Sequence, residues 1–157
     1  MALSYSSVQT MTITGLNSLG SSATVAWQSA VQDNSTDLYE DIHLQVILDM
    51  ANTAPANDKC LYVLAYSGLE TTYSNPASGT EGSITLTNFT NTGQNARQIG
   101  IIPYTTQDEV IESSVMSVAE PFGFILPIKW GIIIVNYSGA AIAASGNSVK
   151  WRGVKHA

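Results

Sequence analysis

One histidine in this sequence has neighbours that could support chemistry, because His43 stands between Asp41 and Gln45 at alternate positions. On a β-strand these three side chains share one face, where a histidine and an aspartate can bind a metal ion or share a proton. A metal site would need a further ligand, and His156, the other histidine, lies at the end of the chain. We therefore expect His43 to be a solvated or interface residue, and we expect no metal or other cofactor.

Other reactive groups also lack the partners that catalysis requires. The densest acidic group comprises Asp108, Glu109, Glu112 and Glu120. Paired carboxylates can cleave glycosidic bonds, but no aromatic cleft is evident beside them, so we expect a solvated patch. The single cysteine, Cys60, falls in an apolar run, which is typical of a core residue. Because no nucleophile elbow, phosphate-binding loop or paired-cysteine motif occurs, the sequence predicts a protein that is not an enzyme. A glycan-active enzyme using Glu109 and Glu112 is the minor alternative.

The tryptophans allow a second, non-catalytic function. Trp27, Trp130 and Trp151 could stack on sugar rings, as tryptophans do on some β-sandwich lectins. The competing interpretation places Trp27 and Trp130 in the core and Trp151 over the end of a sheet. A carbohydrate- or receptor-binding module therefore remains an alternative function.

The clearest structural signal lies in residues 38–50. Apolar side chains occupy the even positions, and only Glu40 interrupts the series: Leu38, Ile42, Leu44, Val46, Leu48 and Met50. A helix would need apolar residues at i, i+3, i+4 and i+7, which polar residues interrupt at several steps. The period of two predicts a long, half-buried strand.

The apolar run at residues 122–135 predicts a second long element. Pro127 and Lys129 interrupt the run, which argues against a helix and against a membrane span. The β-branched residues that follow predict a buried strand at 130–137. Turn residues then separate two further strands, at 140–144 and 148–154. We expect these three strands to form a meander covered by a second sheet.

Shorter strands are predicted at residues 8–14, 23–31, 59–66, 83–87, 97–104 and 110–118. Polar loops are expected at 67–82 and 88–96. About ten strands with little or no helix predict an all-β fold, an antiparallel and jelly-roll-like β-sandwich. We expect one domain at residues 11–154, preceded by a flexible N-terminal arm at 1–10 and followed by a tail at 155–157.

The composition narrows the class of partner. Charged residues make up 11% of the 157 residues, and the formal net charge is −6. Nucleic-acid-binding proteins normally carry a basic surface, so the negative net charge argues against a nucleic-acid partner. A surface with few ions suits packing against protein neighbours, because fewer charges lose their water. The first residues lack the features of a secretory signal, so we expect the protein to fold in a cytoplasm.

The charge is unevenly distributed along the chain. No acidic residue follows Glu120, whereas four basic residues do: Lys129, Lys150, Arg152 and Lys155. A basic edge on an acidic body can pair with an acidic neighbour. The last strand and the short polar N-terminus are therefore the candidate partner-binding segments, with the candidate residues Ser4, Tyr5, Lys150, Trp151 and Arg152.

Three segments carry a resemblance to known proteins: residues 21–34, 126–136 and 138–141. They resemble a group of small tailed-bacteriophage virion proteins, the capsid decoration or cement proteins, along most of the chain from about residue 11 to 154. The resemblance implies a jelly-roll module that trimerises and clamps the outer surface of the major capsid protein. It implies a virion protein assembled in a bacterial cytoplasm, without a nucleic-acid or membrane partner and without catalytic residues. Its content at the level of residues is the structural pair Trp130-Gly131 and the turn at 136–141.

Overall fold

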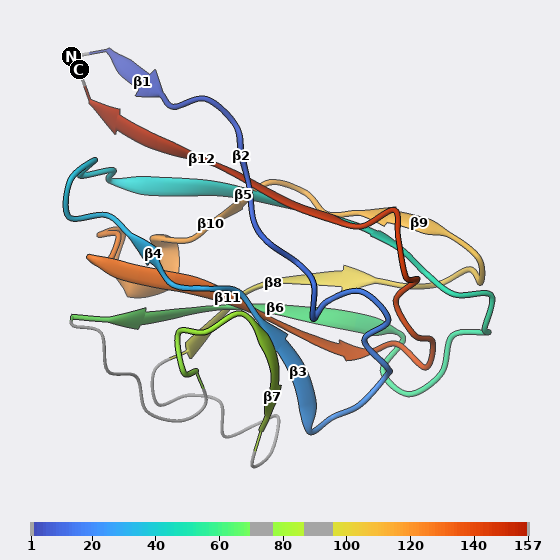
Figure 1. The fold of residues 1–157 in the computed structure, drawn as a ribbon. Coiled ribbons are helices and arrows are strands. Elements are labelled where there is room, and N and C mark those ends of the chain that lie inside the picture. The colour runs from blue at the N-terminus through green and yellow to red at the C-terminus, as the bar shows by residue number, and fades with distance from the viewer. Residues whose placement is uncertain (1, 70–76, 87–95, 157) are drawn as a thin grey trace.

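A computed structural model describes residues 2–69, 77–86 and 96–156. They form two antiparallel sheets packed face to face (Figure 1), which confirms the predicted all-β sandwich. Within these ranges the only helical element is a single 3-10 turn, η2 (Glu120–Phe122). Most of the expected loops at 67–82 and 88–96 lies outside the described residues.

One layer, here called the terminal sheet, has the strand order β1-β12-β5-β10, with β2 paired to β12 and β9 paired to β5. Its strands are β1 (Leu3–Tyr5), β2 (Gln9–Thr10), β5 (Asp41–Asp49), β9 (Val110–Glu112), β10 (Met116–Ser117) and β12 (Ser148–His156). The other layer, the central sheet, has the order β7-β3-β11-β6-β8, with β4 paired to β11. Its strands are β3 (Val25–Gln28), β4 (Gln32–Asp33), β6 (Cys60–Gly68), β7 (Gly82–Thr85), β8 (Ala96–Pro103) and β11 (Lys129–Tyr137).

Strand β5 confirms the period of two read from the sequence. Its even positions are fully buried, and its odd positions are half-buried on the opposite face. The strand starts at Asp41, three residues later than predicted. Asp41 has its side chain on the outer face, where its Oδ1 accepts hydrogen bonds from the Ile42 and Ala119 N–H groups at 2.7 and 2.9 Å.

Strand β11 explains why the apolar run does not alternate with polar residues. It lies inside the central sheet, between β3 and β6. Ile132 and Ile134 pack into the main core between the sheets. Ile133 and Val135 belong to a second apolar cluster on the other face, with Ala26, Leu64 and other buried residues. Because both faces of β11 are covered, both sets of side chains must be apolar.

The Trp130-Gly131 pair has a packing role at the start of β11. Gly131 pairs across the sheet with Tyr66, and a Cβ on Gly131 would lie only 2.3 Å from the Tyr66 ring. The Tyr66 hydroxyl continues past this position and donates to the Ser29 carbonyl at 2.9 Å. Gly131 therefore makes room for a buried tyrosine whose polar end is satisfied. Trp130 beside it is 1% exposed and lies in the main core.

The predicted meander at the C-terminal end is wrong. β11 and β12 belong to different sheets, and the chain at 138–147 crosses between them. Residues 140–144 form no strand and make only an isolated bridge between Ile142 and Met50. The buried Asn136 side chain supports the crossing, since its Nδ2 donates to the Leu19 and Ala140 carbonyls at 3.1 and 2.8 Å. The sequence correctly predicts a turn after β11. It does not predict that the chain then enters the other sheet.

Two other strand predictions change in extent. Residues 110–118 form two short strands, β9 and β10, because Ser113 between them is buried and its hydroxyl accepts the Val46 N–H at 2.9 Å. The predicted strand at 8–14 is reduced to the two residues of β2.

The chain ends differ from the expected flexible arm and tail. β1 pairs antiparallel with the last residues of β12, and the register joins Leu3 to His156 and Tyr5 to Val154. Ser6 extends this contact, because its N–H donates to the Gly153 carbonyl and its hydroxyl accepts the Gly153 N–H. Figure 1 shows the two ends side by side at one corner of the sandwich. The terminal segments are therefore parts of one sheet.

Candidate functional site

The outer face of the terminal sheet gathers polar side chains from β5 and β12. In the antiparallel register Lys150 lies opposite Gln45, and Arg152 lies opposite His43. Directly opposed residues project on the same side of a sheet. The even positions of β12 therefore face outward together with the odd positions of β5.

Tyr5 brings the first strand into this surface. Its ring centroid lies 5.9 Å from that of His43, and the Arg152 Cζ lies 5.7 Å from the Tyr5 centroid. The second contact has the geometry of a cation–π interaction. Tyr5, Arg152 and His43 thus form one group, although they come from the first strand, the last strand and the middle of the chain.

These side chains border an open hollow of about 520 Å³, here called the terminal-sheet hollow. Val8 and Val115, which are 51% and 59% exposed, add apolar walls. The lining includes Tyr5, Val8, His43, Gln45, Val115, Lys150, Trp151 and Arg152. The hollow therefore combines cations, an aromatic ring and aliphatic side chains.

The hollow has an excess of positive charge. Within the described ranges neither Lys150 nor Arg152 forms an ion pair, whereas Lys129 pairs with Asp33. Two acidic groups on or next to β5 accept hydrogen bonds from amide and backbone donors. Glu112 accepts the Gln45 amide at 2.8 Å, and Asp41 accepts backbone N–H groups. In a chain of net charge −6, these two unpaired cations give this face a local charge opposite to that of the whole protein.

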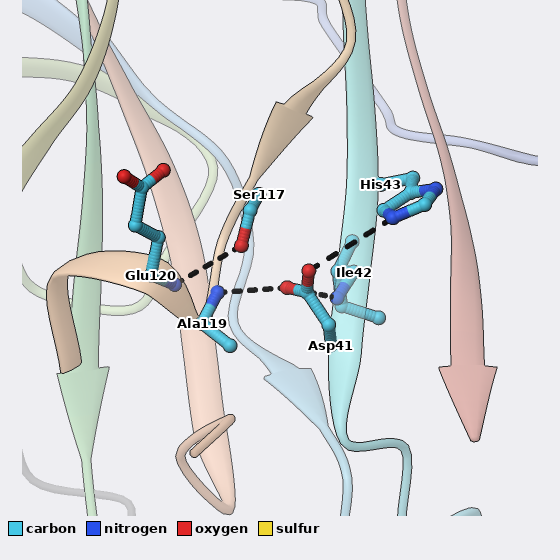
Figure 2. A network of polar contacts seen from close by, with 6 residues as sticks. All are labelled: Asp41, Ile42, His43, Ser117, Ala119 and Glu120. Carbon is cyan, nitrogen blue, oxygen red and sulfur yellow. Dashed lines mark hydrogen bonds and ion pairs between the residues drawn. The ribbon is translucent and has the colours of Figure 1, made fainter. Parts of the chain in front are cut away.

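His43 lines the hollow, whereas its neighbour Asp41 does not. The Asp41 Oδ2 lies 4.0 Å from the His43 Nε2, which is too long for a direct hydrogen bond. Figure 2 shows the Ser117 hydroxyl directed at the Glu120 backbone, whose N–H donates to it at 3.0 Å. No group of three metal-ligating side chains occurs among the residues that the structure describes. Through its hydrogen bonds from the Ile42 and Ala119 N–H groups, Asp41 connects the start of β5 to the chain after β10.

The structure brings together four of the five candidate partner-binding residues. Tyr5, Lys150, Trp151 and Arg152 all border the hollow. Ser4 does not, because adjacent strand residues point to opposite faces and Ser4 pairs with Lys155. Trp151 turns inward and packs edge-on against Trp130, with 5.4 Å between ring centroids.

Sequence analysis missed the contributions of Val8, Gln45 and Val115, and it treated His43 separately. The alternation in residues 41–49 does place His43 and Gln45 on one face. The missing information was that this face adjoins β12, more than a hundred residues later.

The other candidate groups are dispersed or buried. Cys60 is 8% exposed in the core, as predicted. Trp27 and Trp130 are 0% and 1% exposed, so neither offers a face to a sugar. Glu112 is exposed on β9 and bound to Gln45, in the arrangement of a solvated side chain.

One pair of ionisable side chains, Glu40 and His156, meets at the corner where β1 pairs with the end of β12. Glu40 accepts the His156 backbone N–H at 3.2 Å and contacts the His156 Nδ1 at 2.7 Å. These two interactions, the backbone bond first, hold the pKa of Glu40 below its usual value. Glu40 therefore fixes the end of β12 on which β1 pairs.

Neither a scan of protein-family models nor a search of curated proteins finds a match for this chain. The class is therefore defined by the fold, an antiparallel β-sandwich whose outer face carries a cationic hollow. Over the described ranges, no helix has the length and hydrophobicity needed to cross a bilayer.

Proposed function

We propose that this protein is a non-enzymatic virion structural protein, a capsid decoration protein that binds the outer surface of a major capsid protein. The observation that carries the proposal is the meeting of the two predicted partner-binding segments. Tyr5 from β1 and Lys150 and Arg152 from β12 border one hollow on a paired sheet. A rigid binding surface loses little conformational entropy on docking, which favours repeated binding over a large shell.

The remaining surface supports an assembly role. The charged fraction of 11% means that few ions must be desolvated when copies pack against other proteins. The segments at 21–34 and 126–141, which resemble decoration proteins, lie in and around β3 and β11. These segments contribute to the inner architecture, and the hollow supports our choice of the terminal sheet as the binding surface.

A second exposed surface supports the homotrimer that belongs to this proposal. Four large apolar side chains gather around a depression at one end of the sandwich: Leu38, Phe124, Ile125 and Ile128. Phe124 and Ile125 are each 75% exposed. Leu38 and Phe124 have positive φ angles of 52° and 61°, which bulky residues seldom adopt. Apolar side chains exposed in this way are typical of protein–protein contacts, and a closed ring of copies would cover them.

The alternative, a carbohydrate- or receptor-binding module of a phage tail or fibre, rests on a tryptophan platform and on the long loops at 67–82 and 88–96. The structure buries Trp27 and Trp130 and turns Trp151 against Trp130, so the platform is lost. Much of the two loops lies outside the described residues.

Co-sedimentation with capsids tests the proposed function. Purified protein is mixed with expanded heads of the phage that encodes it, and bound copies are counted after centrifugation. We expect saturable binding in a fixed ratio to the major capsid protein. Binding that does not exceed that of an unrelated β-sandwich would reject the proposal.

A further inference from the structure

The two unpaired cations of the terminal-sheet hollow have a defined spacing. Lys150 and Arg152 lie two residues apart on the outer face of β12. One such step along a strand separates Cα atoms by about 7 Å. An extended peptide repeats the side chains of one face at the same interval. A segment with acidic side chains at i and i+2 therefore matches the cations in both spacing and sign.

Arg152 is the stronger of the two positions. Its side chain is half-buried, whereas Lys150 is exposed. Tyr5 holds the guanidinium through the cation–π contact at 5.7 Å. No carboxylate pairs with Arg152 among the described residues, and a guanidinium binds a carboxylate in its plane through two parallel hydrogen bonds.

The apolar walls favour a protein segment over a nucleic acid. Tyr5, Val8 and Val115 are 48%, 51% and 59% exposed beside the cations. An apolar side chain of the bound segment can pack against these walls, whereas a phosphate backbone has no matching group. The net charge of −6 would also repel a polyanion at long range.

The chain itself does not carry the matching pattern. Its twelve acidic residues include no pair at i and i+2 anywhere in the sequence. A second copy therefore lacks the complementary segment, and a different protein must supply it.

We propose that the terminal-sheet hollow binds an extended acidic-x-acidic segment of a partner protein. Arg152 holds one carboxylate in bidentate fashion, Lys150 faces the other, and an apolar side chain two positions before or after this acidic pair shares its face and packs on the apolar walls. The identity of that partner as the major capsid protein rests on the proposed function. The ligand chemistry rests on the hollow alone.

Nuclear magnetic resonance titration of the full chain tests this inference. Three probes are used. The first is a capped Thr-Glu-Val-Glu-Thr peptide, the second is a capped Thr-Glu-Glu-Val-Thr peptide of the same composition, and the third is a short thymidine oligonucleotide. The variants are Arg152→Gln, Lys150→Gln and Lys155→Gln. Lys155→Gln is the matched control, because Lys155 belongs to the same strand but lies over the Tyr39 ring, 5.4 Å from its centroid.

The first peptide should shift resonances of residues around the hollow and bind better than the second, with an affinity that falls as salt rises. Arg152→Gln should weaken binding by about tenfold, Lys150→Gln by less, and Lys155→Gln should bind like the native protein. Arg152→Lys should recover part of the loss, since it keeps the charge without the planar fork. Thermal melting verifies that each variant is folded.

Equal binding of the two peptides, preferred binding of the oligonucleotide, or native binding by Arg152→Gln would overturn the inference. The results also distinguish a failure of this inference from a failure of the proposed function. If heads bind Arg152→Gln as well as the native protein, the inference fails and the proposed function stands. If the spaced peptide binds selectively but heads bind no protein, the proposed function fails and the ligand chemistry stands.

Discussion

The guanidinium of Arg152 lies over the ring of Tyr5, with 5.7 Å between the Arg152 Cζ and the ring centroid. This contact joins the first strand of the chain to the last. It also completes the wall of the terminal-sheet hollow, next to the His43 ring from β5. Tyr5 therefore has two roles, since it fastens β1 and positions Arg152.

Replacement of Tyr5 by alanine tests both roles. Loss of the cation–π contact at an exposed site should lower the free energy of unfolding by about 1 kcal/mol. Tyr5→Phe keeps the ring and should unfold like the native protein. Urea denaturation followed by tryptophan fluorescence measures the difference. Equal stability of the alanine and phenylalanine variants would show that the ring contributes nothing to the fold.

The contact between Glu40 and His156 should make the chain ends sensitive to acid. The pKa of Glu40 is lowered in the folded protein, chiefly by the hydrogen bond from the His156 backbone N–H and then by the His156 side chain. The unfolded chain therefore takes up a proton first as the pH falls. The stabilisation is present above the usual Glu pKa of 4.5 and is lost as the pH falls through the lower folded value.

Hydrogen exchange at the His156 amide measures this effect. Protection should fall as the pH drops below the usual Glu pKa of 4.5, after correction for the intrinsic exchange rate. Glu40→Gln should show weaker protection at the higher pH and little further change on acidification. A pH dependence that survives in Glu40→Gln would assign the effect to another group.

The crossing between the sheets depends on a glycine in a left-handed conformation. Gly139 has φ 89°, and a Cβ there would lie 2.4 Å from the Ala56 backbone nitrogen. Gly139→Ala combines backbone strain with a clash against the main chain, so it should destabilise the protein by about 2–4 kcal/mol. Gly20→Ala is the matched control, because a Cβ at Gly20 meets nothing within 4 Å. Thermal unfolding of both variants tests this, and a Gly139→Ala variant as stable as Gly20→Ala would contradict the described turn.

The sequence pattern correctly predicts those strands in which buried side chains recur at a regular interval along the chain. β5 alternates because one of its faces meets the core, and β11 is continuously apolar because both of its faces are covered. Both properties follow from side-chain periodicity, which a sequence displays directly.

The sheet that a strand enters is set by contacts between distant segments. The turn residues at Ser138 and Gly139 are visible in the sequence, but the bonds from Asn136 to Leu19 and Ala140 that direct the chain across the sandwich are not. The hollow has the same origin, because β5 pairs with β12 and β12 with β1 over long separations. Charge pattern alone therefore identified Lys150 and Arg152 but not their neighbours His43 and Gln45.

The proposed decoration function is tested most directly by a cryo-electron reconstruction of a phage head with and without this protein. We expect density for the sandwich on the outer surface of the shell, with β1, β5 and β12 facing the major capsid protein and an acidic segment seated at Arg152. A head without such density, or one in which the central sheet faces the shell and the hollow faces solvent, would contradict the account.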